Sequence, residues 1–227
     1  MKRITALLAL AISICPFASS FAQNSVAELK QKADAGDPAA EVKLGMKYAI
    51  GTPRDSQEAM TWFRLAADHG YADGQYRLGG MYDVGTSPQN PTEAIKWYTL
   101  AAQQGHRDAQ YRLGVMYEQG RGTDKDLAQA AQWYAKAGAQ GRPEAQYQLG
   151  MMYEEGQGVE QSYSNAMKWY LMAAKQGRPE AEFKVGHLYE KGLGTAKSKS
   201  EAIAWYQKSS GHGFPDATDA MKALQEQ

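Results

Sequence analysis

Cysteine is almost absent from this sequence of 227 residues, whose single cysteine, Cys15, lies within the first 22 residues. These residues have the pattern of a secretory signal peptide: Lys2 and Arg3 precede an apolar segment over 4–14, and a small-x-small site ends at Ala22. The apolar segment is shorter than the ~20 residues that a membrane-spanning helix needs. We therefore expect cleavage after Ala22. The exported chain would have no disulfide, no thiol nucleophile and no thiolate ligand for a metal.

The sequence also lacks an excess of charge of either sign, with 25 basic and 25 acidic residues. Loss of residues 1–22 removes two basic residues and leaves 23 against 25, a net charge of −2. This balance gives no electrostatic reason to expect a nucleic-acid partner or a polybasic contact with a membrane. We predict a periplasmic chain, or alternatively a secreted one, with no integral membrane segment after cleavage.

Motifs that carry chemistry are missing as well. The Gly-x-Ser-x-Gly and Ser-x-x-Lys motifs of serine nucleophiles do not occur. The Gly-x-Gly sequences at 120–122, 156–158 and 192–194 lack the preceding strand and the spacing of a phosphate loop, which favours helix caps. No pair of histidines has the spacing of metal ligands, and we expect lone, solvated side chains at His69, His106, His187 and His212. The sequence therefore predicts no catalytic residue, no metal site and no cofactor.

The sequence does contain an internal repeat. Five tryptophans, each followed by another aromatic residue, lie 35 or 36 residues apart at Trp62, Trp97, Trp133, Trp169 and Trp205. A Leu-Gly or Val-Gly pair recurs at a similar interval, beginning at Leu44, Leu78, Leu113, Leu149 and Val185. Each repeat has two apolar stripes with the spacing of an α-helix and a glycine after each stripe. The sequence therefore predicts five helical hairpins, over 37–70, 71–105, 106–141, 142–177 and 178–213.

The repeated residues also predict how the helices pack. A glycine inside a helix costs ~1 kcal/mol relative to alanine, so the repeated glycine indicates close approach of a neighbouring helix. The constant tryptophan spacing favours core packing over a cofactor site, and we expect Trp133→Ala to cost ~3–5 kcal/mol by cavity formation. Residues 23–36 and 214–227 each fit a single helix with a polar outer face, which is typical of the capping units of a solenoid.

These columns resemble the Sel1-like repeat, a relative of the tetratricopeptide repeat. The unit 142–177 matches the pattern at Ala145, Tyr147, Leu149, Gly150, Met152, Tyr153, Gly156, Gly158 and Val159, then at Ala166, Trp169, Tyr170, Ala173, Ala174 and Gly177. The resemblance implies an all-α fold, a right-handed α-solenoid of about five hairpins with a capping helix at each end. The first two units have Gly-Thr-Pro at 51–53 and Gly-Thr-Ser-Pro at 85–88 in place of Gly-x-Gly, so we expect different turns there.

The resemblance further implies a function in protein binding. We expect a non-catalytic scaffold or adaptor of the bacterial cell envelope that holds a partner protein or peptide in its concave groove. One alternative is a hydrolase of β-lactams or peptidoglycan, an activity linked to a cysteine-rich branch of these repeats, although the paired cysteines of that branch are missing here. Another is binding of envelope polysaccharide or peptidoglycan through surface aromatic residues.

A second line of side chains runs beside the core stripe of each first helix, at positions i, i+4 and i+7. In the second to fifth hairpins it carries an aromatic residue, then a variable residue, then an acid, whereas the first hairpin has Val42, Met46 and Ala49. The candidate partner-binding residues are Tyr76, Asp83, Tyr111, Val115, Glu118, Tyr147, Met151, Glu154, Phe183, His187 and Glu190. Together they would suit an extended or helical peptide with apolar and basic groups. The aromatic column has a second interpretation, in which it only completes the packing between repeats.

Overall fold

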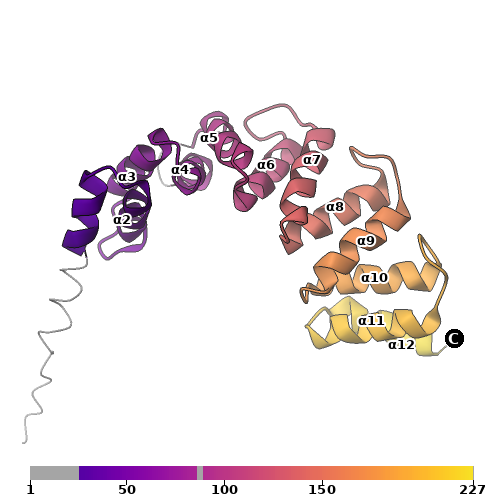
Figure 1. Cartoon of the computed structure of the whole chain (residues 1–227). Coiled ribbons are helices and arrows are strands. Elements are labelled where there is room, and N and C mark those ends of the chain that lie inside the picture. The colour runs from indigo at the N-terminus through magenta and orange to yellow at the C-terminus, as the bar shows by residue number, and fades with distance from the viewer. Residues whose placement is uncertain (1–25, 86–88, 227) are drawn as a thin grey trace, which may run out of the picture.

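A computed structural model describes residues 26–85 and 89–226 of the chain (Figure 1). Within these ranges the chain forms twelve helices and no strand. The first helix covers 26–34 and is followed by α2 (Pro38–Ile50), α3 (Ser56–Asp68), α4 (Ala72–Val84), α5 (Pro91–Gln103), α6 (Arg107–Gln119), α7 (Leu127–Ala139), α8 (Pro143–Glu155), α9 (Tyr163–Ala174), α10 (Pro179–Lys191), α11 (Lys199–Gly211) and α12 (Pro215–Gln225). The predicted signal segment, 1–22, lies outside the described residues.

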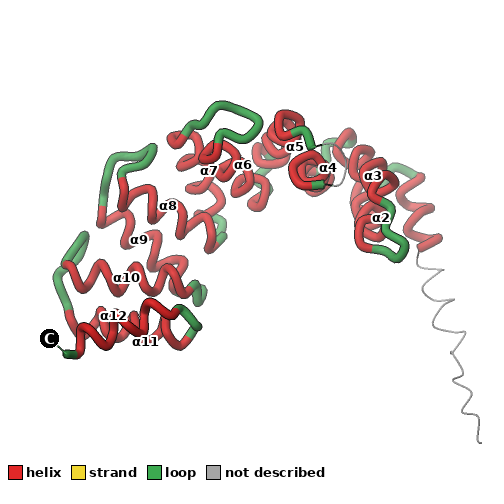
Figure 2. The backbone as a smooth tube through the Cα atoms, turned by 180° about the vertical axis from the view of Figure 1, so that it is seen from behind, coloured by secondary structure: helices red, strands yellow, loops and turns green. Residues whose placement is uncertain are grey.

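The helices α2 to α11 pair in chain order as five hairpins, and each hairpin packs on the next. Figures 1 and 2 show the result as one curved row, with the helix over 26–34 at one end and α12 at the other. This arrangement confirms the all-α solenoid predicted from the repeat. Since each hairpin contacts mainly its neighbours, stability is distributed along the row rather than concentrated in one central core.

Polar caps and prolines set where the helices begin. The second helix of each hairpin follows a short polar side chain that accepts a hydrogen bond from the backbone N–H two or three residues later: Asp55, Asn90, Asp126, Ser162 and Ser198. The first helices α8 and α10 instead begin with a proline, which lacks the N–H that would have no partner there. The helices α2 and α5 have both a proline and a side-chain cap.

Glycines end the first helices in two different ways. Gly120, Gly156 and Gly192 lie in the left-handed region, with φ of 68°, 71° and 70°, which confirms the predicted caps. The first two hairpins differ, as predicted from their loop sequences, because Gly51 and Gly85 are extended, with φ of −69° and −70°. Of the second loop, 86–88 lie outside the described residues.

The core of each hairpin is an aromatic ring packed against a glycine of the first helix. A Cβ atom added to any of the glycines of the Leu-Gly or Val-Gly pairs would lie within 2.5–2.7 Å of a ring carbon. The pairs are Gly45–Phe63, Gly79–Tyr98, Gly114–Tyr134, Gly150–Tyr170 and Gly186–Tyr206. The predicted close approach of the two helices is therefore confirmed. Glycine is needed at this position because the aromatic ring occupies the space that a Cβ atom would fill.

The tryptophans lie at the edge of this core. Trp62 is buried, but the other four are only partly buried, and each packs against the core formed with the preceding hairpin. The ammonium group of Lys136 lies 3.9 Å from the centroid of the Trp133 ring, on its solvent side. Trp133 thus packs against the core, as the constant spacing predicts, but it is only partly buried. The aromatic residue that follows each tryptophan fills the core.

Candidate binding surface

The first and second helices of the hairpins differ in how much of their surface is covered. In α6 only Arg107 and Gln119, at the two ends, are exposed. In α7 an exposed stripe runs along the whole helix, through Ala128, Gln132, Lys136 and Ala139. A helix on the inner side of a curved row is crowded by its neighbours, whereas one on the outer side faces solvent. Figure 1 shows α4 on the inner side of the row and α5 above it.

The three columns predicted as a binding site lie on these first helices, and we call them together the inner surface. Its aromatic residues contact the buried ring of their own hairpin, at centroid distances of 5.3–5.8 Å. These residues are Tyr76, Tyr111, Tyr147 and Phe183.

The next repeat contacts each of these aromatic residues as well. The guanidinium of Arg142 lies 4.4 Å from the centroid of Tyr111, and that of Arg178 lies 4.8 Å from the centroid of Tyr147. His106 stacks on Tyr76, and Phe214 packs against Phe183. The aromatic column thus contributes to packing between repeats, and part of its ring surface is already covered.

The acids of the inner surface accept hydrogen bonds from the buried tyrosines. The hydroxyl of Tyr134 donates to Glu118 at 2.6 Å, that of Tyr170 to Glu154 at 2.5 Å, and that of Tyr206 to Glu190 at 2.7 Å. Burial raises the pKa of each of these tyrosine hydroxyls, and the neighbouring carboxylate raises it further. The longer contact of Tyr98 with Asp83, at 3.4 Å, belongs to the same column. Asp83 itself is buried, so the prediction that it contacts a partner was wrong.

The variable column lies between the aromatic residues and the acids. Val115 and Met151 are partly buried, and each packs against the core formed between its own hairpin and the next, with part of its side chain still exposed. His187 occupies the equivalent position on α10, one turn before Glu190. Burial raises the pKa of Glu190, but hydrogen bonds from Lys191 and Tyr206 outweigh burial and lower that pKa below its ordinary value. The variable residues therefore form a partly apolar strip along the middle of the inner surface.

Sequence reasoning missed a buried polar pair that recurs in all five hairpins. A buried polar residue directly precedes each aromatic position, or the equivalent position in the first hairpin. It pairs with a residue that lies one or two positions after the end of a second helix. In the three middle hairpins two glutamines pair at 2.8 Å: Gln104 with Gln75, Gln140 with Gln110, and Gln176 with Gln146. The sequence did carry a signal, because the dipeptide Gln-Tyr recurs in the same three hairpins.

In the first and last hairpins the same position holds a glutamate and a histidine. Nδ1 of His69 lies 3.0 Å from Glu41, and Nδ1 of His212 lies 2.8 Å from Glu182. His106 also has partners, because its Nδ1 accepts the N–H of Ala109 and its ring stacks on a tyrosine. The expectation that these three histidines lack partners was therefore wrong, although His69 and His212 are exposed as expected.

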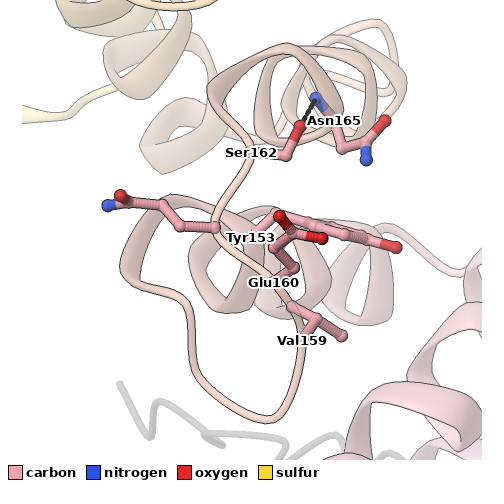
Figure 3. Close-up of a pocket in the computed structure, with 6 residues that line it drawn as sticks. Tyr153, Val159, Glu160, Ser162 and Asn165 are labelled. Carbon is pink, nitrogen blue, oxygen red and sulfur yellow. Dashed lines mark hydrogen bonds between the residues drawn. The ribbon is translucent and has the colours of Figure 1, made fainter.

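The structure also contains a hollow of about 540 Å³ between the end of α8 and the start of α9 (Figure 3). It is lined by Tyr153, Val159, Glu160, Gln161, Ser162 and Asn165. The hydroxyl of Ser162 accepts a hydrogen bond from the backbone N–H of Asn165 at 3.3 Å and so serves as a helix cap.

Over the described ranges, no group of three or more metal-ligating side chains comes together. None of the helices described is long and apolar enough to cross a bilayer.

Comparison with known proteins gives a family and a set of structural relatives. Five segments of the chain match the Sel1 repeat: 38–71, 72–106, 107–141, 143–177 and 179–214. A protective antigen present in uropathogenic Escherichia coli strains, which displays an SLR fold, is 37% identical with a TM-score of 0.83, and the match covers 88% of this chain and 43% of that one. A Sel1 repeat protein from Oxalobacter formigenes is 34% identical with a TM-score of 0.77, covering 89% and 60%.

These two relatives are longer than the protein, which spans about half of their length. A comparison with curated proteins gives no match.

Proposed function

Because the chain belongs to the Sel1 repeat family, we propose that it is a non-catalytic scaffold of the bacterial cell envelope, which binds a partner protein on its inner surface. Sel1 repeat proteins generally mediate protein–protein interactions, and their solenoid is typically an interaction scaffold. The packed hairpins hold the side chains of such a surface in place before the partner arrives. Binding then costs less conformational entropy than it would on a flexible chain.

The observation that carries this proposal is the partial exposure of Val115 and Met151 in the middle of the inner surface. The aromatic residues beside them are held by packing between repeats, and the acids beside them by tyrosine hydroxyls. A partly exposed valine and a conformationally adaptable methionine within a fixed polar frame suit an apolar segment of a partner protein.

The envelope location rests on the pattern of residues 1–22, with its basic start, apolar segment and small residues before Gln23. N-terminal sequencing of the protein recovered from a periplasmic fraction or from the medium tests it. A mature chain that begins at Gln23 supports export. A full-length chain found only in the cytoplasm contradicts it.

The binding surface is tested by capture from an envelope extract on immobilised protein. The double substitution Val115→Glu/Met151→Glu places two charges on the inner surface, and Ala128→Glu/Gln132→Glu places two on the exposed stripe of α7. We expect the inner pair to abolish recovery of a partner and the outer pair to leave it unchanged. Circular dichroism checks that both variants are folded. Equal recovery by the two folded variants contradicts the proposal.

A further inference from the structure

The acids of the inner surface differ in whether the chain itself supplies them with a cation. Asp83 forms an ion pair with Arg121 at 2.6 Å, Glu154 with Lys184 at 3.0 Å, and Glu190 with Lys191 at 2.5 Å. Among the described residues, Glu118 has no such ion pair, and its hydrogen-bond partner is the neutral hydroxyl of Tyr134. One acid in the middle of the inner surface therefore lacks the counter-charge that its equivalents have.

The register of the repeats explains this difference. Lys184, which pairs with Glu154, directly follows the aromatic residue of the next first helix. The residue at the equivalent position beside Glu118 is Gln148, which follows Tyr147. Position 148 thus bears a neutral side chain where the next repeat has a lysine.

The loops show the same replacement. Arg121, which pairs with Asp83, lies in the middle of the Gly-x-Gly turn of the next hairpin. The turn equivalent to it for Glu118 is 156–158, and its middle residue is Gln157. Both positions that supply a cation to the neighbouring acids are therefore glutamine around Glu118.

We infer that Glu118 receives a lysine or arginine side chain from the partner protein, an inference that rests on the function proposed above. The carboxylate lies on α6 one turn after Val115, and Gln148 lies on α8 one turn before Met151. The methylene stem of a lysine or arginine can pack on the two apolar side chains while its charged end reaches the carboxylate. Within the chain, the ammonium group of Lys184 reaches Glu154 at 3.0 Å from the position equivalent to Gln148.

Charge complementarity of this kind selects the partner more than it raises the affinity. A partly buried carboxylate with one neutral donor gains from a charge-assisted hydrogen bond, because such bonds are roughly twice as strong as neutral ones. Partners that present an acid at this position would be rejected. The partner should therefore expose a basic residue within an apolar segment.

The substitution Gln148→Lys tests this inference, because it supplies Glu118 with the cation that Lys184 gives to Glu154. The probe is a set of short peptides, selected from a random displayed library on the full-length immobilised chain, with dissociation constants measured by fluorescence anisotropy. Gln132→Lys is the matched control, since it makes the same change on the outer stripe of α7. We expect selected peptides to contain lysine or arginine, and Gln148→Lys and Glu118→Gln each to weaken binding about tenfold.

Replacing the basic residue of a selected peptide with norleucine tests whether that residue contacts Glu118. We expect this change to weaken binding to the wild type and to leave binding to Glu118→Gln unchanged. Gln148→Lys should melt at the same temperature as the wild type or higher, which separates lost binding from lost folding.

The outcomes separate this inference from the proposed function. If Gln148→Lys and Glu118→Gln bind the selected peptides as tightly as the wild type does, Glu118 does not receive a basic side chain. Selection of peptides without basic residues would lead to the same conclusion. If Val115→Glu/Met151→Glu still abolishes binding in that case, the inner surface stands and only the basic side chain is excluded. Selected peptides that bind Val115→Glu/Met151→Glu as tightly as the wild type overturn both.

Discussion

A Cβ atom on Gly79 would lie 2.7 Å from Cδ1 of Tyr98, because the tyrosine ring packs directly against the backbone of α4. The same contact recurs in each of the five hairpins and brings its two helices together. The hydroxyl of the same ring also faces an acid on the inner surface. In the second to fifth hairpins one buried tyrosine therefore links the core of the repeat to the acid column of the inner surface.

The adjacent glycines of α4 give a matched test of this packing. Gly79→Ala is expected to destabilise the protein by about 1–3 kcal/mol, since the new methyl group overlaps the buried Tyr98 ring. At Gly80 the nearest atom to a new Cβ is the Tyr98 hydroxyl at 3.6 Å, an ordinary contact. Gly80→Ala should therefore stabilise the helix by about 0.5–1 kcal/mol. Urea denaturation measures both, and equal effects of the two substitutions would contradict the packing described.

The neighbouring aromatic residues of α7 test which one fills the core. Tyr134 is fully buried, whereas Trp133 is partly exposed and covered on one side by a lysine. We expect Tyr134→Ala to cost about 3–5 kcal/mol and Trp133→Ala about 1–3 kcal/mol. The comparison uses the free energy of unfolding of each variant. A larger loss for the tryptophan would reverse this assignment.

The Glu182–His212 pair of the last hairpin tests whether the two kinds of buried polar pair contribute equally to stability. Removing the histidine by His212→Ala leaves the buried carboxylate of Glu182 without its partner, which should cost about 1–3 kcal/mol. The double substitution Glu182→Gln/His212→Gln reproduces the pair found in the middle hairpins and should retain wild-type stability. Thermal denaturation of both proteins measures this, and a double variant as unstable as His212→Ala would show that the two kinds of pair are not equivalent.

The buried tyrosines predict loss of stability at high pH. In the folded protein the pKa values of Tyr98, Tyr134, Tyr170 and Tyr206 lie above the ordinary value of 10.0, chiefly because burial disfavours the charged form. Above pH 10 the unfolded chain loses these protons and the folded chain keeps them, so stability is complete below pH 10 and falls as the pH rises beyond it.

Ultraviolet absorbance of tyrosinate, recorded with the helical circular dichroism signal during an alkaline titration, tests this expectation. The four hydroxyls should ionise only together with the loss of helical signal. Ionisation of every tyrosine near pH 10 in a protein that keeps its helices would contradict their burial.

The fold could be predicted from the sequence because the residues that define each hairpin recur in all five repeats. The constant spacing of Trp97 and Trp133, and of the glycine after Leu78 and Leu113, defines two helices per repeat and their close approach. Caps such as Asp126 and Gly120 can be recognised locally, because they bond only to backbone a few residues away.

The details of the inner surface could not be predicted in this way. Trp133 and Tyr134 belong to the same apolar stripe, and only the tertiary packing shows which of the two rings is enclosed. The partner of Glu118 is Tyr134, 16 residues away, and that of Glu182 is His212, 30 residues away. Such contacts depend on tertiary geometry and leave no helical periodicity in the sequence.

Site-specific photo-crosslinking in living cells tests the proposed binding surface most directly. A photoreactive residue at position 115 lies on the inner surface, and one at position 132 lies on the exposed stripe of α7. We predict a discrete crosslinked adduct with a partner protein from position 115 and none from position 132. Adducts from position 132 alone, or the same adducts from both positions, would contradict binding on the inner surface.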